Sequence, residues 1–263
     1  MEPIEGLGPK ILLVDLETAA VLGWSWVFYD ANLIDTFRDW SILCYAFKWD
    51  GDKEIQVSSI THPKDIWDFI KHPDNDKALV KELWRLLDQA DFVVAHNAKA
   101  FDVKKIRSRF LHYGMPPPSP FKVIDTLTET RRISNNTRNN QDALLKSWGL
   151  GKKLENRGWP MWRDCMNGDR KSWKEMEEYN KIDIVGLAAL FKHLRPWISS
   201  VNSSAMHFDA TTCPKPGCGS KSLQNRGWFY TKMMQYRQIS CNQCGGWSRI
   251  AQSEPRTKPL VSL

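Results

Sequence analysis

The sequence contains neither a long hydrophobic run nor a basic N-terminal segment followed by an apolar one. No apolar stretch approaches the ~20 residues that a membrane-spanning helix needs. The first residues, Met1-Glu2-Pro3-Ile4-Glu5, are acidic and unlike a secretory signal. We therefore expect a cytoplasmic protein with no membrane partner. A chain of 263 residues, 42% apolar and 25% charged, has room for one large domain and a small one.

Cysteine is rare along most of the chain. Cys44 and Cys165 are isolated, whereas the other four of the six cysteines fall within the last 51 residues. In a chain without an export signal, such clustering favours a metal site over disulfides.

Acidic residues are nearly absent from the C-terminal tail. Residues 207–263 contain 8 Lys/Arg and 2 Asp/Glu, whereas residues 1–206 contain 29 and 28. The tail therefore carries most of the net charge of +7. A basic module suggests a polyanionic partner such as nucleic acid, although a solvated basic surface has the same composition.

Apolar patterns alternate between strand-like and helix-like along residues 10–194. Short apolar runs predict strands at 10–14, 40–49, 54–60, 92–95 and 121–124. Longer amphipathic patterns predict helices at 75–90, 99–113 and 172–194. Residues 134–170 are polar and interrupted, with one short helix expected at 143–148. This order predicts an α/β or α+β sheet with helices on both sides. The serine-rich stretch 199–204 is the candidate linker, which places one domain at 1–200 and a second at 201–263.

Four carboxylates occur at positions that suit metal-dependent phosphodiester cleavage. Asp15 and Glu17 form a D-x-E pair at the end of the first predicted strand. Asp102 falls in the first turn of a predicted helix, and Asp183 lies on the long late helix. Mg²⁺ and Mn²⁺ prefer oxygen ligands, and two such ions ~3.5–4 Å apart can assist an in-line displacement.

With these four carboxylates in this order and local sequence context, the chain resembles the DnaQ-like 3′→5′ exonucleases, the DEDD superfamily of the ribonuclease H-like fold. The resemblance covers roughly residues 8–197 and rests on Asp15, Glu17, Asp102 and Asp183. One branch of the family has His five residues before the last Asp, where this chain has Glu178. The other branch has Tyr four residues before it, which corresponds to Tyr179. The chain therefore resembles the tyrosine branch, which includes polymerase proofreading domains and RNA exonucleases.

The resemblance implies a ribonuclease H-like mixed sheet with flanking helices and two Mg²⁺ or Mn²⁺ ions in the active site. It implies that Asp15, Glu17 and Asp183 are the core ligands, that Asp102 acts through water, and that Tyr179 orients the attacking water. We also expect Thr18, His96, Asn97 and Phe101 to contact the substrate.

Simpler structural roles remain open for several of these residues. Asp15 and Glu17 could cap a surface strand, and Asp102 could merely favour a helix macrodipole. Tyr179 and Phe101 could be core residues, and His96 could be structural. Asp183 is harder to explain in this way, because its neighbours Ile182, Ile184 and Val185 are apolar and burial of a lone carboxylate is costly.

The four clustered cysteines are arranged as two short pairs. Cys213 and Cys218 precede Cys241 and Cys244, with 22 residues between the pairs. Four thiolates suit a closed, structural zinc site, and the tail resembles a zinc ribbon over about residues 208–251. So small a module needs metal to supply its folding free energy. Free or disulfide-bonded cysteines are the alternative.

Aromatic and basic residues alternate between the cysteine pairs. Arg226, Trp228 and Arg237 are our candidates for contact with single-stranded nucleic acid, in which bases stack on rings and phosphates pair with cations. Hairpin packing and docking to a protein are the alternatives.

Together these features predict a stand-alone, metal-dependent 3′→5′ exonuclease that acts on DNA 3′ ends in proofreading, repair or genome processing. A DNA polymerase or another replisome protein is a possible partner, and a bacterial or phage source would fit. An RNA-directed exonuclease is the alternative enzyme. A non-catalytic nucleic-acid-binding adaptor is the alternative outside enzymes.

Overall fold

The computed structural model describes residues 9–30, 32–60, 74–201, 211–231 and 234–255. The chain folds into two compact units, one comprising residues 10–191 and the other containing the described residues from Lys192 onward. The acidic N-terminus and part of the predicted linker at 199–204 lie outside the described residues. Within the described part, no helix combines the length and apolar character needed to cross a membrane.

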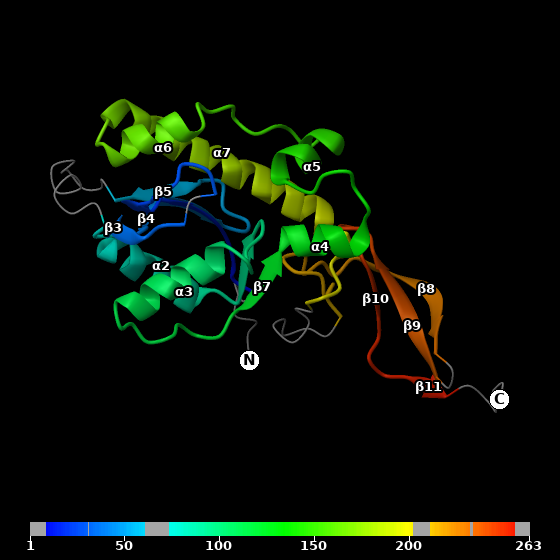
Figure 1. The fold of residues 1–263 in the computed structure, drawn as a ribbon. Helices are drawn as coiled ribbons and strands as arrows, with labels where there is room; N and C mark the ends of the chain where they lie inside the picture. Colours follow the sequence, from blue (N-terminus) through cyan, green and yellow to red (C-terminus); the bar gives the residue numbers. More distant parts are fainter. Residues whose placement is uncertain (1–8, 31, 61–73, 202–210, 232–233, 256–263) are drawn as a thin grey trace. The chain divides into compact units, whose positions relative to one another are not determined.

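A five-stranded mixed sheet forms the centre of the first unit, in the order β5-β4-β1-β6-β7 (Figure 1). Its strands are β1 (Ile11–Thr18), β4 (Ile42–Trp49), β5 (Gln56–Ser59), β6 (Phe92–Ala95) and β7 (Lys122–Asp125). Strand β1 pairs antiparallel with β4 and parallel with β6, so it is central and largely buried. The expected α/β sheet is confirmed, and β1 extends four residues beyond its predicted end at residue 14.

Helices cover both faces of this sheet (Figure 1). Helices α2 (Lys77–Gln89) and α3 (Asp102–His112) pack their buried apolar residues against Leu12, Val14 and Leu16 of β1. Helices α6 (Trp159–Met166) and α7 (Arg170–Leu194) pack against Leu43 and Cys44 on the opposite face. Burial of these apolar stripes supplies the main stabilisation of the unit.

Four short elements of the first unit were not predicted from the sequence. Helix α4 (Thr126–Ile133) follows β7 directly, and α6 lies within the segment predicted to be broken. The ribbon of β2 (Leu22–Trp24) and β3 (Asp35–Arg38) exposes most of its apolar side chains.

The predicted helix at 143–148 is present as α5 (Gln141–Ser147).

The second unit contains a small antiparallel sheet. Strands β8 (Leu223–Tyr230), β10 (Trp247–Arg249) and β11 (Glu254–Pro255) each pair with β9 (Met234–Cys241). A 3₁₀ turn at Arg195–Trp197 follows α7. Arg195 donates a hydrogen bond to the carbonyl of Gly217, and Lys215 donates one to the carbonyl of Ile198.

Candidate active site

Strand β1 presents two carboxylates on one face of the sheet. Side chains alternate along a strand, and Leu12, Val14 and Leu16 face the core beneath α2 and α3. Asp15 and Glu17 therefore face the opposite side, toward α6 and α7. The hydrophobic residues on the other face fix this orientation, because a shift of one residue would bury both carboxylates in the apolar core.

Helix α7 supplies the polar residues that meet this face. Asp183 is 2% exposed, and Tyr179 lies one turn before it. Asn180 is fully buried, and its Nδ2 donates to Asp15 Oδ2 at 2.7 Å. The contact of Asn180 with Asp15 joins α7 directly to β1. Sequence reasoning missed Asn180, because a single Asn on a helix has many possible roles.

The loop before α3 is held by Asp125 at the end of β7. Its carboxylate accepts hydrogen bonds from the backbone N–H groups of Asn97 and Lys99, at 3.0 and 3.1 Å. Asn97 has a φ of +70°, which Asn tolerates better than most residues. Asp102 then begins α3, and its Oδ1 accepts a hydrogen bond from Leu16 N at 3.3 Å. The structure thus brings Asp102 to β1, next to the D-x-E pair.

The four predicted carboxylates line one cleft. Ligand oxygens of Asp15, Glu17 and Asp183 lie within 4.8 Å of one another, and Asp102 lines the same cleft beside them. Such crowding raises the free energy of the ionised state. The pKa of Asp15 is raised by burial and then by the charges of Asp102, Glu17 and Asp183. Burial raises the pKa of Glu17 to about 8 and that of Asp102 to about 7.

Lys153 adds a cation to this acidic cleft. Its Nζ donates to Asp183 Oδ2 at 2.8 Å, whereas Asp183 Oδ1 is buried without a protein partner among the described residues. Burial raises the pKa of Asp183, and the ammonium group opposes that shift. An all-oxygen cluster with an unsatisfied buried oxygen fits a hard divalent cation. Sequence reasoning missed Lys153, because it lies in an irregular segment between α5 and α6.

Tyr179 lines the cleft and is half-buried. The ring of Trp162 on α6 meets it edge-on, with centroids 6.1 Å apart. Burial and the charge of Asp183 raise the pKa of Tyr179, so the hydroxyl keeps its proton at neutral pH. Trp162 also lines the cleft and was not predicted, because α6 was not predicted.

Four further residues predicted to contact substrate also line this cleft: Thr18, His96, Asn97 and Phe101. His96 uses both ring nitrogens within the protein, with Nδ1 2.9 Å from Thr126 Oγ1 and Nε2 3.0 Å from Asn139 O. Burial lowers its pKa, which disfavours the imidazolium form. These contacts indicate a structural role for His96. Phe101 is 37% exposed at the mouth of the cleft and therefore is not a core residue.

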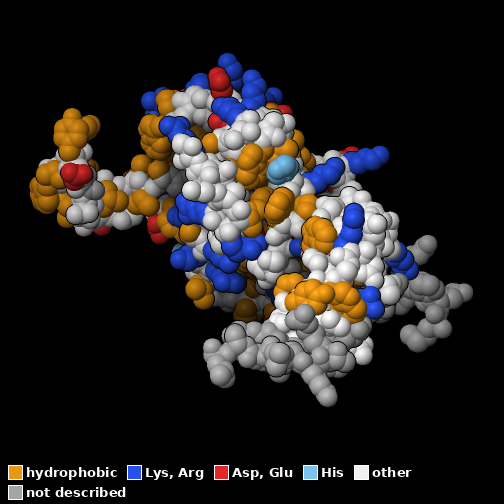
Figure 2. Space-filling view, turned by 90° about the vertical axis from the view of Figure 1, so that its right-hand side faces the viewer, with side chains coloured by type: hydrophobic (Ala, Val, Ile, Leu, Met, Phe, Trp, Pro, Cys, Tyr) orange, Lys and Arg blue, Asp and Glu red, His pale blue; other side chains and the backbone are white. Residues whose placement is uncertain are grey.

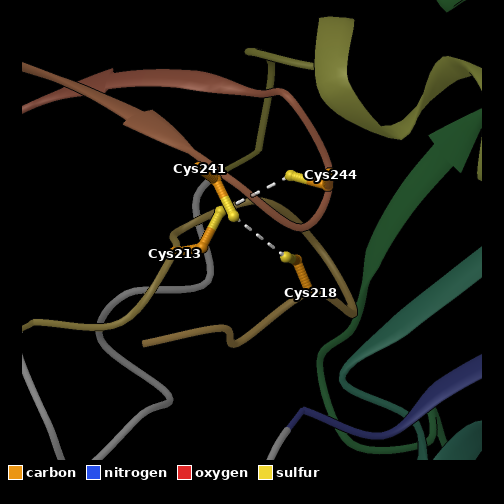
Figure 3. A group of neighbouring side chains, drawn as sticks. All are labelled: Cys213, Cys218, Cys241 and Cys244. Atoms are coloured by element: carbon orange, nitrogen blue, oxygen red, sulfur yellow. Dashed lines mark hydrogen bonds between the residues drawn. The ribbon is translucent and has the colours of Figure 1, made fainter. Parts of the chain in front are cut away.

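The four C-terminal cysteines form a second cluster. Their Sγ atoms lie within 4.8 Å of one another, and the side chains of both pairs converge (Figure 3). Cys213 Sγ is 3.7 Å from Cys244 Sγ, and Cys218 Sγ is 3.8 Å from Cys241 Sγ. These separations exceed a disulfide bond and suit four thiolates around one metal ion. Burial raises the pKa of Cys213 and raises that of Cys218 to about 11, whereas hydrogen bonds that outweigh burial lower the pKa of Cys241 to about 7.

The three predicted nucleic-acid contacts of the tail lie on β8 and β9. Trp228 and Arg237 are cross-strand partners, and the Arg237 guanidinium lies 3.9 Å from the centroid of the Trp228 ring. Arg226 is exposed beside Gly227, at a bulge in β8. Trp228 and Arg237 therefore form one cation–π pair.

The chain was compared with protein-family models, curated proteins and solved structures, and the family model agrees with this fold. A family model described as the RNase H superfamily matches residues 54–195, which include Asp102, Tyr179 and Asp183 but not the β1 pair. No curated protein matches the chain. The chain is similar to the family B DNA polymerase from the hyperthermophilic archaeon Pyrobaculum calidifontis, with 14% identity and a TM-score of 0.48. That similarity covers 75% of this chain and 26% of the polymerase, so the chain spans about a quarter of its length.

The family match spans more than half of the sequence, and the mixed sheet with helices on both faces has the corresponding architecture. The protein therefore belongs to the RNase H superfamily.

Proposed function

We propose that this protein is a metal-dependent 3′→5′ exonuclease that removes nucleotides from DNA 3′ ends. The observation that carries the proposal is the meeting of Asp15, Glu17, Asp102, Asp183 and Tyr179 around one cleft. These residues come from β1, α3 and α7, which are far apart in the sequence. Carboxylates that only capped a strand or favoured a helix dipole would not be expected to lie together in one cleft.

The acidic cluster would hold two Mg²⁺ or Mn²⁺ ions. Asp15, Glu17 and Asp183 have their ligand atoms close enough to share cations. Asp102 would act through water, because its Oδ1 already accepts a backbone hydrogen bond. When bound, two such ions activate an attacking water and stabilise the leaving 3′ oxygen. Binding would also relieve the repulsion among the carboxylates, which adds to the effect of burial in raising the pKa of Asp15.

Tyr179 would orient the attacking water rather than accept its proton. Its raised pKa makes the phenolate too rare to serve as a base at neutral pH. A neutral hydroxyl beside Asp183 can still position water by hydrogen bonding. Correct orientation of a nucleophile contributes orders of magnitude in rate.

Lys153 would change its partner as the site fills. Its ammonium group neutralises part of the charge on Asp183. A divalent ion on Asp183 would repel this group, which would then remain in the cleft, where its charge attracts a phosphate. We infer that Lys153 contacts the backbone of the terminal nucleotide.

The cysteine cluster would hold one structural Zn²⁺. A closed set of four sulfur donors leaves no open coordination position, which argues against a catalytic zinc. The metal would join the Cys213–Cys218 turn to the Cys241–Cys244 turn and so fix the β8–β9 hairpin between them.

A degradation ladder tests the proposed direction and substrate. Matched 5′-labelled single-stranded DNA and RNA would be incubated with Mg²⁺ or Mn²⁺. Stepwise shortening of DNA, with each product one nucleotide shorter, is the expected result. Shortening of RNA alone would assign the enzyme to RNA, and no shortening of either strand would favour a non-catalytic adaptor.

A further inference from the structure

The sheet of the second unit has two chemically different faces. Cross-strand pairing places Trp228 beside Arg237, and Phe229 beside Tyr236. Because side chains alternate along a strand, these two pairs lie on opposite faces. The register of β10 with β9 places Trp247 and Arg249 beside Ser240 and Gln238, on the same side as Tyr236. We call the side with Phe229, Tyr236, Trp247 and Arg249 the Phe229 face.

The Phe229 face carries rings with a guanidinium between them. The ring centroids of Phe229 and Tyr236 are 6.3 Å apart. The Arg249 guanidinium lies 3.8 Å from the Tyr236 centroid and 5.6 Å from that of Phe229. Phe229 is 44% exposed and Trp247 is 51% exposed. The face thus offers exposed rings on β8 and β10, with the Tyr236 ring of β9 lying against the Arg249 guanidinium between them.

The opposite face carries Trp228 and Arg237, two of the three residues chosen from sequence. There Arg237 covers the Trp228 ring at 3.9 Å, and that ring is partly buried. Tyr230, directly after Phe229 in β8, is 52% exposed on this second face. The two faces therefore provide matched aromatic and matched arginine residues for comparison.

Charge identifies the class of ligand. Residues 211–255 contain six Lys/Arg and one acidic residue, Glu254. Figure 2 shows Lys and Arg side chains interspersed with hydrophobic ones on the side of the molecule that it draws. A protein partner with an ordinary mixed surface does not require such a bias. A phosphate backbone does, because each neutralised phosphate releases counterions.

We propose that the Phe229 face binds single-stranded nucleic acid, with bases stacked on Phe229 and Trp247 and a phosphate held by Arg249. Single strands are favoured over duplex because stacking needs the face of an unpaired base, which a duplex hides within its helix. The inference deepens the proposed function, since the bound strand would be the one that is trimmed, but binding is measurable without cleavage.

Fluorescence anisotropy tests the proposal on the full, zinc-loaded chain with Asp183→Asn to prevent cleavage. The probes are a 5′-fluorescein 20-nucleotide oligo(dT) and a labelled 20-base-pair duplex. Phe229→Ala, Trp247→Ala and Arg249→Gln are compared with Tyr230→Ala and Arg237→Gln. Zinc content and circular dichroism confirm that each variant is folded.

The expected result is tighter binding of the single strand than of the duplex. Each substitution on the Phe229 face should weaken single-strand binding about 5-fold or more, which is the scale of losing one base contact. Each substitution on the opposite face should weaken single-strand binding less than about 2-fold. The two arginine substitutions remove equal charge, so a difference between them reports a local phosphate contact of Arg249 rather than net charge.

Three results would overturn the proposal: tighter duplex binding, a larger loss from Tyr230→Ala and Arg237→Gln, or unchanged affinity in every variant. The last would assign the exposed rings to a protein partner. The oligonucleotide could bind in the expected pattern while the degradation ladder shows no shortening. That result would support this inference and overturn the proposed exonuclease activity.

Discussion

The Nζ atom of Lys153 lies 2.8 Å from Oδ2 of Asp183, so an ammonium group reaches into the acidic cluster. Asp183 is 2% exposed, and an unpaired carboxylate there would be costly. Lys153 therefore stabilises the same carboxylate that a divalent ion would use. If the cluster binds a divalent ion as proposed, that ion would compete with the ammonium group of Lys153 for Asp183.

Replacement of Lys153 by Met should strengthen Mn²⁺ binding in the absence of substrate, by about 10-fold if the lost competition is worth ~1.4 kcal/mol. The same change should slow nucleotide release, because a phosphate contact is lost. Isothermal titration with Mn²⁺ and single-turnover kinetics would measure the two effects. Lys152→Met is the control, because Lys152 is exposed. Weaker Mn²⁺ binding by Lys153→Met would contradict the competition.

The metal-free protein should lose stability as pH rises from about 5 to about 8. Glu17 and Asp102 have pKa values raised to about 8 and about 7 in the folded chain, above the ~4 of unfolded carboxylates. Between pH ~4 and these raised pKa values, the folded state therefore binds more protons than the unfolded state, so the free energy of unfolding falls as pH rises. Denaturant titrations without added Mg²⁺ or Mn²⁺ at pH 5.5, 7 and 8.5 would measure this trend.

Glu17→Gln should reduce this pH dependence, because the amide cannot ionise. Addition of Mn²⁺ to the unmutated protein should also flatten it, since the ions replace the protons. A stability that rises with pH in the metal-free protein would show that the carboxylates are not crowded as described.

Tyr179→Phe should slow cleavage while leaving metal binding intact. The ring still packs against Trp162, but the hydroxyl that would orient water is gone. We expect a loss of about 10- to 100-fold in single-turnover rate, with Mn²⁺ affinity within about 2-fold of the original. An unchanged rate would indicate that Tyr179 only packs against its neighbours and does not orient water.

The purified protein should contain one Zn²⁺ per chain. Replacement of Cys213 or Cys241 by Ser should lower that content and unfold the β8–β9 hairpin, because this small sheet has little core of its own. Cys44→Ala and Cys165→Ala should retain the zinc, since both cysteines are buried in the first unit. Metal analysis and circular dichroism check both statements. Zinc loss in the Cys44 variant would contradict the cluster assignment.

The strands and helices with strong apolar periodicity were predictable. The stripe of Leu79, Leu83 and Leu87 identified α2, and the apolar run 92–95 matches β6 residue for residue. Helix α6 was missed because its sequence, Trp-Pro-Met-Trp-Arg-Asp-Cys-Met, lies in a polar, glycine-containing region and is only eight residues long. Its stability comes from Met161 and Cys165 packed in the core, which a local pattern does not reveal.

The predicted site residues shared a recognisable order along the chain, whereas the missed ones depended on tertiary contacts. Asp15, Glu17, Asp102 and Asp183 each stand at the end of a regular element or on the face of one. Lys153 reaches the cleft from an irregular loop whose backbone is anchored by Asp142, since Lys153 N donates to Asp142 Oδ1 at 3.1 Å. Such a side chain can be placed only when the loop path is known.

The rate of nucleotide release from a single-stranded DNA 3′ end in the presence of Mn²⁺ tests the central claim most directly. The unmutated chain would be compared with Asp15→Asn, Asp183→Asn and Glu178→Gln, where Glu178 is an exposed acid on the same helix as Asp183. We predict release by the unmutated chain and by Glu178→Gln, and a loss of at least about 100-fold in both aspartate variants. Equal rates in all four proteins would show that the acidic cleft is not the active site.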